Sequence, residues 1–148
     1  MFKKIMIALD GSPEALTALE SAQSLADAFG AEIHLVSVEV PHFPHGLEWK
    51  LTQAAYLDKK DKELRDYLSH WSEKLAQGGR LVSTKVLPPG SIVAHLLDEV
   101  ENYRADLLVL SSHGRSGISR LLFGSTAEEL NRRAICAVLV VHPRKDQC

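Results

Sequence analysis

The segment from Ser111 to Thr126, SSHGRSGISRLLFGST, combines small and hydroxyl residues in a way that suits an anion-binding loop. Its end reads STAE from Ser125, which is the S-x-x-E form of a capping box and predicts that a helix begins there. Helix N-termini favour phosphate groups, and Gly124 would allow a close approach. Gly114 can adopt a positive φ and turn backbone N–H groups toward an anion. An ordinary strand-loop-helix junction also needs a glycine and a serine cap, so this segment alone leaves both interpretations open.

A second candidate is Asp10, a carboxylate that ends the otherwise apolar run KKIMIAL. Such a carboxylate can accept hydrogen bonds from the ribose hydroxyls of a nucleotide. It can equally cap the helix that begins at Pro13. The end of the next apolar run, near Val38, could offer an apolar slot and a backbone edge for an adenine ring. A carboxylate, an apolar slot and a helix N-terminus around one crevice together favour a nucleotide site.

A regular alternation of predicted strands and helices would place these candidate residues. Five apolar runs rich in β-branched residues predict strands: Lys3 to Leu9, Glu32 to Val40, Arg80 to Pro88, Ala105 to Ser111 and Ala137 to Pro143. Four patterns of helical period lie between them: Pro13 to Gly30 with Ser12 as its cap, about Trp49 to Gln77, Ile92 to Val100 with Ser91 as its cap, and Ser125 to about Arg133.

This order predicts an α/β fold of three layers, with an open parallel sheet and right-handed crossovers. We expect the five strands in the order 3-2-1-4-5, with two helices on each face. In such sheets, ligands bind outside the carboxyl ends of the strands where the strand order reverses. The reversal lies between the first and fourth strands, so Asp10 and the residues from Ser111 to Gly114 should lie on opposite sides of one crevice.

The composition limits the class of protein. The 148 residues are 45% hydrophobic and 24% charged, as in an ordinary globular domain, and no run approaches the length of a membrane span. The net charge of −2 lacks the basic excess typical of nucleic-acid-binding domains. Cys136 and Cys148 have no metal-binding spacing and suggest a reducing compartment. We therefore expect one cytoplasmic domain without a signal peptide that binds neither nucleic acid nor a membrane.

No pattern in the sequence predicts a catalytic centre. The chain lacks the G-x4-G-K-[ST] motif of P-loop enzymes and shows no Ser/His/Asp arrangement with identifiable roles. His42 and His45 are too few ligands for a metal site, and His113 has no visible carboxylate partner. We expect no catalytic residue, no metal site and no enzymatic activity, although slow ATP hydrolysis or self-phosphorylation stays open.

The chain resembles the universal stress protein family, in its single-domain bacterial type, over nearly all of residues 1–148. The resemblance is carried by KKIMIALDGSPEALTALE, ADLLVLSSHGRSGISRLLFGSTAEEL and CAVLVVHP. The nucleotide-binding branch of that family has G-x2-G-x9-G-(S/T) after its fourth strand. Gly114, Gly124 and Ser125 match this motif, and Ser111 stands at the first glycine position. The resemblance implies a single domain with a Rossmann-like fold, similar to that of adenine nucleotide alpha hydrolases.

The resemblance also implies an ATP site, which AMP or ADP could share, with Mg2+ accompanying ATP. Asp10 would meet the ribose, the backbone of Val38 the adenine, and Gly124 to Thr126 the phosphates. The residues that it implies in nucleotide binding are Ala8, Leu9, Asp10, Val38, Ser111, Ser112, His113, Gly114, Arg115, Gly124, Ser125 and Thr126.

Under this interpretation the protein is an ATP-binding stress-response regulator. The family tends to form homodimers through its last strand, here Ala137 to Pro143, and a further protein partner would respond to the ligand. Two alternatives remain at this point. One is a dimeric stress-response interaction protein that binds no nucleotide, and the other is a slow ATPase or self-phosphorylating enzyme.

Overall fold

The computed structural model describes residues 1–38, 49–112 and 125–142, and for residues 38, 49–57, 125 and 126 it describes the backbone alone. Strands and helices alternate along the described chain, as the apolar runs predict. In chain order they are β1 (Lys4–Leu9), α1 (Ala15–Phe29), β2 (Glu32–Val38), α2 (Trp49–Ala76), β3 (Val82–Leu87), α3 (Ile92–Tyr103), β4 (Leu107–Ser111), α4 (Ser125–Arg133) and β5 (Ala137–Val141).

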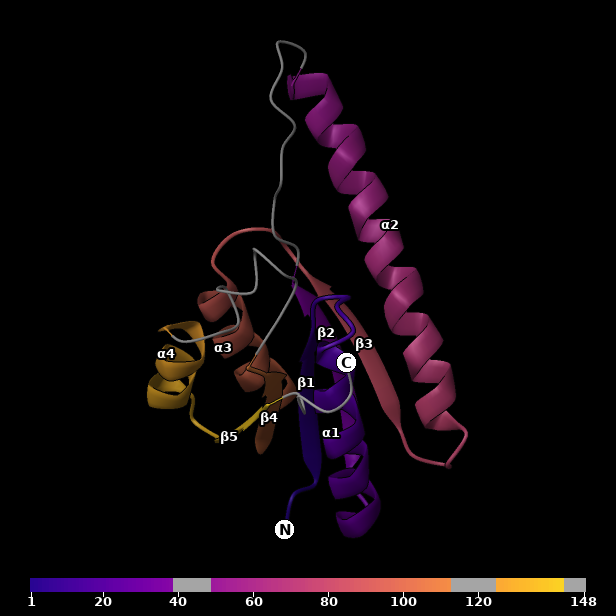
Figure 1. Cartoon of the computed structure of the whole chain (residues 1–148), viewed down its shortest axis with the longest axis vertical. Coiled ribbons are helices and arrows are strands. Elements are labelled where there is room, and N and C mark those ends of the chain that lie inside the picture. Colours follow the sequence, from indigo (N-terminus) through magenta and orange to yellow (C-terminus); the bar gives the residue numbers. More distant parts are fainter. Residues whose placement is uncertain (39–48, 113–124, 143–148) are drawn as a thin grey trace.

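The strands form one sheet in the order β3-β2-β1-β4-β5, and every neighbouring pair is parallel (Figure 1). Strand β1 therefore lies at the centre and pairs with β2 on one side and β4 on the other. This confirms the predicted order and places the reversal of strand order between β1 and β4.

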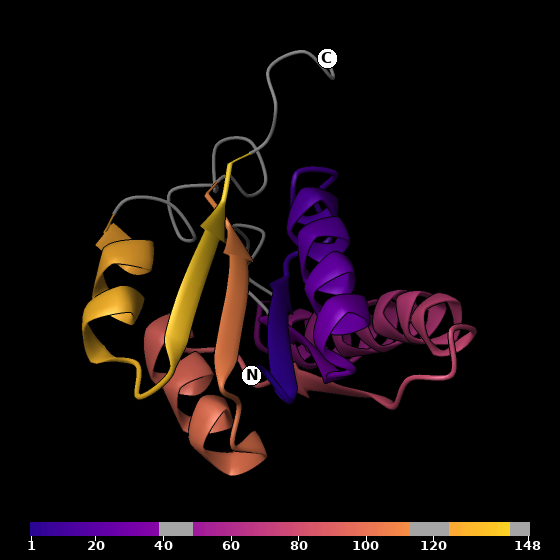
Figure 2. The same ribbon diagram turned by 90° about the horizontal axis from the view of Figure 1, so that it is seen from below.

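Helices cover both faces of the sheet, with α1 and α2 on one face and α3 and α4 on the other (Figure 2). Successive side chains of β1 point alternately to the two faces of the sheet. Ile5 and Ile7 pack in the core under α1 and α2, whereas Met6 and Ala8 pack in the core under α3 and α4. Because both faces are covered, the central strands are apolar at nearly every position. The three-layer α/β architecture is thus confirmed.

Two serines begin helices as the sequence predicts. Ser91 Oγ accepts a hydrogen bond from Ala94 N at 3.3 Å at the start of α3. Ser12 Oγ accepts one from Ala15 N at 3.2 Å. The regular part of α1 begins at Ala15, later than the expected Pro13, because the first turn has bonds between residues three apart, such as Leu16 N to Pro13 O at 3.1 Å.

Some strands are shorter than the apolar runs that predict them. Strand β4 begins at Leu107 and not at Ala105, and the Asp106 carboxylate just before it binds the backbone at the start of β1. Its oxygens accept hydrogen bonds from Lys3 N at 2.8 Å and Lys4 N at 3.1 Å. The Asp106 side chain thus connects the amino ends of β1 and β4. These ends lie at the edge of the sheet opposite the predicted crevice.

Gly30 ends α1 in the left-handed conformation, with φ at 66°. A Cβ at this position would meet no heavy atom within 4 Å, so the cost of a substitution would come from the left-handed backbone conformation and not from a steric clash. We expect Gly30→Ala to lower the free energy of unfolding by about 1–2 kcal/mol, which is the cost of the left-handed region for an L-residue. Urea denaturation measures it. Asparagine tolerates this region better, so Gly30→Asn should cost less, and equal costs would contradict the backbone explanation.

Candidate functional site

The sheet opens between β1 and β4 at its carboxyl edge. Pairing of β1 with β4 ends at Ile7 and Val109, although both strands continue. Strand β1 stays paired with β2 as far as Leu9, and β4 stays paired with β5 as far as Ser111. The two central strands therefore separate at their carboxyl ends while their outer neighbours hold each in place. This separation lies where the strand order predicts a ligand-binding crevice.

Asp10 lies on the β1 side of this crevice and is half-buried. Its Oδ1 accepts hydrogen bonds from Ser12 N at 2.9 Å and Ser12 Oγ at 2.5 Å. Ser12 in turn caps α1 through Ala15 N. The carboxylate thus stabilises the start of the helix, which was the alternative role predicted for it, and the same bonds fix its position beside the crevice.

Ser111 and Ser112 lie on the β4 side, and each is only 2% exposed. Ser112 N donates a hydrogen bond to Val141 O at 2.8 Å, which ties this end of β4 to β5. Among the described residues other than glycine, only Arg104 has a positive φ. Ser111 therefore occupies the first glycine position of the motif without backbone strain.

A buried hydroxyl lies close to the expected adenine slot. Ser37 is fully buried in β2, pairs in register with Leu9 and precedes Val38. Within the described structure its Oγ has no hydrogen-bond partner. A buried hydroxyl of this kind can satisfy a polar atom of a ligand. Ser37 could not be predicted from the sequence, because a serine inside a strand does not by itself indicate a ligand contact.

The structure brings together only part of the predicted site. Ala8, Leu9, Asp10, Ser111 and Ser112 lie around the carboxyl ends of β1 and β4, and the backbone of Val38 ends β2. Helix α4 begins at Ser125, as the capping box predicts, but the side chains of Ser125 and Thr126 are not described. Four predicted residues lie outside the described part of the chain: His113, Gly114, Arg115 and Gly124. The role of all these residues in binding stays a prediction.

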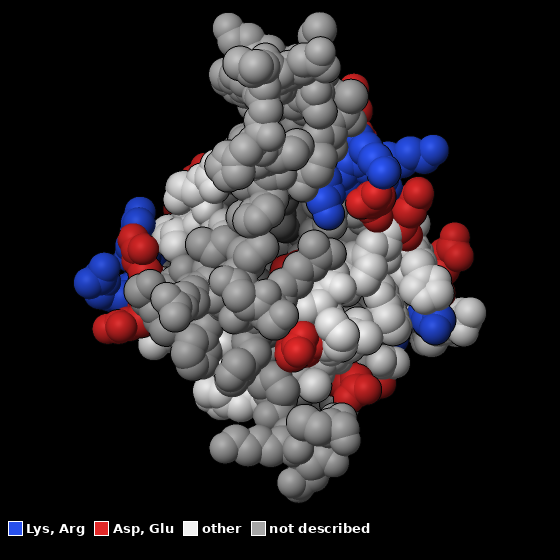
Figure 3. Space-filling view, turned by 45° about the horizontal axis from the view of Figure 1, so that its top comes forward, with Lys and Arg blue, Asp and Glu red and all other residues white. Residues whose placement is uncertain are grey.

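The face of the molecule shown in Figure 3 carries side chains of both charges. On the face shown in Figure 3, acidic and basic side chains lie next to one another at both sides of the molecule. The part of the chain that the structure describes contains no group of three or more His, Cys, Asp or Glu residues that could hold a metal ion. Among the described helices, none is both long and apolar enough to cross a bilayer.

A second polar cluster, which the sequence analysis missed, lies between β2, β3 and α3. His34 and Glu99 are each 5% exposed, and His34 Nε2 is 2.9 Å from Glu99 Oε1. His34 Nδ1 is 2.7 Å from Ser83 Oγ, and Lys85 Nζ donates to Glu99 Oε2 at 2.8 Å. The Tyr103 ring stacks on the His34 ring, with centroids 4.4 Å apart and 19° between the planes. The sequence shows no Ser/His/Asp arrangement with identifiable roles, whereas the described structure joins Ser83, His34 and Glu99 through hydrogen bonds.

The sequence offered only a weak signal for this cluster. His34 is the single ionisable residue inside the buried run IHLVS, and Glu99 lies on the buried side of α3 among Leu96 and Val100. A buried ionisable group requires a partner, so two such residues could have been paired. Their separation of 65 positions hid the pair, because only the packing of α3 against the sheet brings them together.

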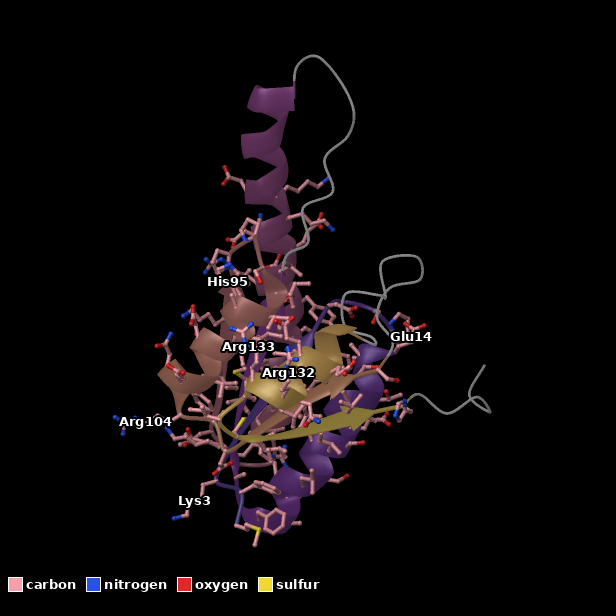
Figure 4. All side chains as sticks on the ribbon, turned by 90° about the vertical axis from the view of Figure 1, so that its left-hand side faces the viewer. Lys3, Glu14, His95, Arg104, Arg132 and Arg133 are labelled. Carbon is pink, nitrogen blue, oxygen red and sulfur yellow. The ribbon has the colours of Figure 1, made fainter. Side chains whose placement is uncertain are left out.

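The position of this cluster is distinct from the crevice. Ser83 is the second residue of β3, and Tyr103 is the last residue of α3, so both lie toward the amino edge of the sheet. Figure 4 shows this edge through the labelled side chains Lys3 and Arg104, whereas Glu14, at the start of α1, lies at the opposite edge. The two sites therefore occupy opposite edges of the sheet.

The cluster shifts the titration of its members. Burial raises the pKa of Glu99, but hydrogen bonds and charges from Lys85 and His34 outweigh burial and hold this pKa below its ordinary value of 4.5. Burial and the hydrogen bond that its hydroxyl donates to Glu32 Oε1 at 2.9 Å raise the pKa of Tyr103. Glu99 is thus ionised and Tyr103 is protonated at neutral pH.

The lowered pKa of Glu99 predicts a dependence of stability on pH. Because the folded pKa lies below the unfolded one, the carboxylate stabilises the fold above pH 4.5, and this contribution is lost as the pH falls through the lower folded value. Urea denaturation across that range should show a steeper loss of stability for the wild-type protein than for Glu99→Gln. Glu101 is exposed on the same helix, so Glu101→Gln should keep the wild-type slope. Equal slopes for all three proteins would contradict the assigned shift.

The fold and the crevice together define the class of protein. An open parallel sheet with a strand-order reversal beside an acidic strand end belongs to the doubly wound α/β proteins, which bind ligands at that reversal. Within this class the sequence model of the universal stress protein family matches residues 1–142, and the chain belongs to that family. A relative in Methanocaldococcus jannaschii, universal stress protein MJ0531, is 32% identical over 152 aligned residues, which cover 99% of this chain and 86% of the relative.

Solved structures show the same fold. UspA of Lactobacillus plantarum has a TM-score of 0.79 at 21% identity, with 95% of this chain and 97% of that chain covered. A universal stress protein in complex with cAMP has a TM-score of 0.69 at 22% identity, with 97% and 99% covered. A family member of Arabidopsis thaliana with AMP bound has a TM-score of 0.67 at 18% identity, with 98% and 94% covered.

Proposed function

We propose that this protein binds ATP, or the related AMP and ADP, in the crevice between β1 and β4 and acts as a dimeric stress-response regulator. The separation of these two strands beside Asp10 is the observation that carries the proposal. Related structures with bound cAMP and AMP support an adenine nucleotide as the ligand. The backbone at Ser111 also supports it, because serine at the first glycine position introduces no strain there.

Each part of the crevice would meet one part of the nucleotide. The Asp10 carboxylate would accept hydrogen bonds from the ribose hydroxyls. The backbone of Val38 would meet the adenine ring, with the Ser37 hydroxyl buried beside it. The N-terminus of α4 at Ser125 would face the phosphates, because its N–H groups and helix dipole favour negative charge.

Mg2+ would accompany ATP chiefly through the phosphates. The described residues offer no cluster of metal ligands, so the triphosphate and water would supply most of the coordination. The described residues would contribute a fixed position for the nucleotide and no dedicated metal cage. AMP and ADP would share the adenosine contacts and would bind without a requirement for Mg2+.

The regulatory role would come from the difference between ligand-bound and ligand-free states. A nucleotide that binds one conformation better shifts the population toward it, and a partner protein can respond to that shift. The dimer would form through the last strand, Ala137 to Pro143, whose described part is the outer strand β5 of the sheet. A reducing cytoplasm suits the free, half-buried thiol of Cys136. The role proposed for the crevice is ligand binding and not catalysis.

Amide NMR spectra recorded during a titration with AMP test where the nucleotide binds. We expect the amide signals of Leu9, Asp10 and Ser112 to move in proportion to ligand occupancy. The amide of Tyr103, at the other edge of the sheet, should stay in place. Shifts centred on Tyr103, or shifts spread evenly over the surface, would place the ligand elsewhere and contradict the proposal.

A further inference from the structure

We propose that Ser83, His34 and Glu99 form a second site in which Ser83 is an activated nucleophile that accepts acyl groups from small esters. The three side chains come from β3, β2 and α3 and form a continuous hydrogen-bonded chain. The nucleotide crevice lies at the other edge of the sheet, so this site stands independently of the proposed nucleotide binding.

The hydrogen bonds assign the tautomer of His34. The ionised Glu99 carboxylate only accepts hydrogen bonds, so the proton between them belongs to His34 Nε2, 2.9 Å from Oε1. When the imidazole is neutral, its lone pair is on Nδ1, which lies 2.7 Å from Ser83 Oγ and can take the hydroxyl proton. The Ser83 hydroxyl also hydrogen-bonds Tyr103. This is the arrangement in which an oriented imidazole serves as general base for a serine.

The surroundings hold the base in one orientation. Lys85 Nζ donates to the second oxygen of Glu99 at 2.8 Å, which fixes the carboxylate and balances its charge. The Tyr103 ring stacks on the imidazole at 4.4 Å and restricts rotation of its plane. A general base fixed by a carboxylate and by packing needs no rearrangement to receive a proton.

The nucleophile is open to solvent while its base is shielded. Ser83 is exposed on β3, the outer strand of the sheet, whereas His34 and Glu99 are each 5% exposed. N–H groups alternate between the two sides of a parallel strand, and Ile33 N donates to Leu81 O at 3.0 Å. By this alternation the Thr84 N–H is directed away from β2, next to Ser83, where it can donate to a developing oxyanion.

The reaction follows from this geometry. Ser83 Oγ attacks the ester carbonyl carbon, and its proton passes to His34 Nδ1. The bond from that carbon to the leaving oxygen breaks, and the leaving alcohol takes the proton from His34. Water then attacks the acyl-serine with the same base, which releases a carboxylic acid and restores the Ser83 hydroxyl. Ester and water are thus converted to acid and alcohol, and no other reactant is needed.

Acetylation by p-nitrophenyl acetate tests the proposal on the full chain. Peptide mapping by mass spectrometry should show acetyl groups on Ser83, formed about 100-fold faster than on Ser24, consistent with general-base catalysis. Ser24 is the matched control, because it is also exposed but its hydroxyl donates to the Glu20 carbonyl at 3.1 Å and, in the described structure, bonds no imidazole. Ser83→Ala should remove the fast release of p-nitrophenol, whereas Ser24→Ala should not.

The role of Glu99 is one of positioning and needs its own measurement. Glu99→Gln should lower the acetylation rate of Ser83 by about tenfold or more, and Glu99→Asp should restore part of that rate because it restores a carboxylate. Circular dichroism and thermal unfolding establish that each variant is folded. If the Glu99 variants unfold, the proposal is tested by the acetylation rates of Ser83 and Ser24 in the wild-type protein alone. Equal acetylation of the two serines, or unchanged p-nitrophenol release in Ser83→Ala, would overturn the proposal.

Discussion

Glu99→Ala is expected to lower the free energy of unfolding by about 3–5 kcal/mol, the range for removing one partner of a buried ion pair. The loss would leave His34 and Lys85 without the carboxylate that binds both of them, at 2.9 Å and 2.8 Å. His34 has almost no access to water, so its Nε2–H would lose its hydrogen-bond partner inside the protein. Urea denaturation at neutral pH measures the change.

Two control variants separate this network from general effects of substitution on α3. Glu101 is exposed on the same helix, so Glu101→Ala should change stability by less than about 0.5 kcal/mol. Lys85 is about half-exposed, with 47% of its side chain accessible, so Lys85→Ala should cost much less than Glu99→Ala. A loss in Glu99→Ala no larger than that in Glu101→Ala would show that the buried network does not stabilise the fold.

Asp10→Ala is expected to weaken nucleotide binding by roughly 10- to 100-fold, corresponding to about 1.5–3 kcal/mol for hydrogen bonds to a charged group. The carboxylate lies on the β1 side of the crevice, and Ser12 holds it there through two hydrogen bonds. Its removal would take away the acceptor for the ribose hydroxyls. Calorimetric titration with ATP gives the dissociation constants.

Because Asp10 also stabilises the start of α1, its two roles need separate variants. Ser12→Ala removes the helix cap and keeps the carboxylate, so it should reduce stability by about 1 kcal/mol and affect binding less than Asp10→Ala does. Asp98→Ala removes an exposed carboxylate on α3 and should leave binding unchanged. Equal affinity of the Asp10 and Asp98 variants would exclude the proposed ribose contact.

Local sequence patterns predict the fold well because the signals of this chain agree with one another. The apolar runs are short and bounded, and Ser91 and Gly30 mark helix ends that the structure confirms. The strand order follows from the alternation of strands and helices, since right-handed crossovers leave few topologies. Strand limits were less predictable: before the start of β4, the Asp106 carboxylate accepts hydrogen bonds from Lys3 N and Lys4 N, which are distant in sequence.

The candidate site is predictable where it follows the chain and unpredictable where it depends on register. Asp10 and Ser111 each end a strand, so topology alone places them at one crevice. The hydrogen bonds that Asp10 accepts from Ser12 could not be predicted in this way, because they depend on the geometry of the local turn. His34 and Ser83 meet because β2 and β3 pair in one register, and a shift of one residue would turn Ser83 to the other face.

Isothermal titration calorimetry of the wild-type protein with ATP tests the central claim most directly. The crevice between β1 and β4 predicts a saturable heat with one nucleotide bound per chain, and competition by AMP for the same site. GTP should bind more weakly, because the backbone at Val38 and the slot beside it are proposed to meet adenine. The absence of any heat with millimolar ATP, or binding that AMP does not displace, would contradict the account.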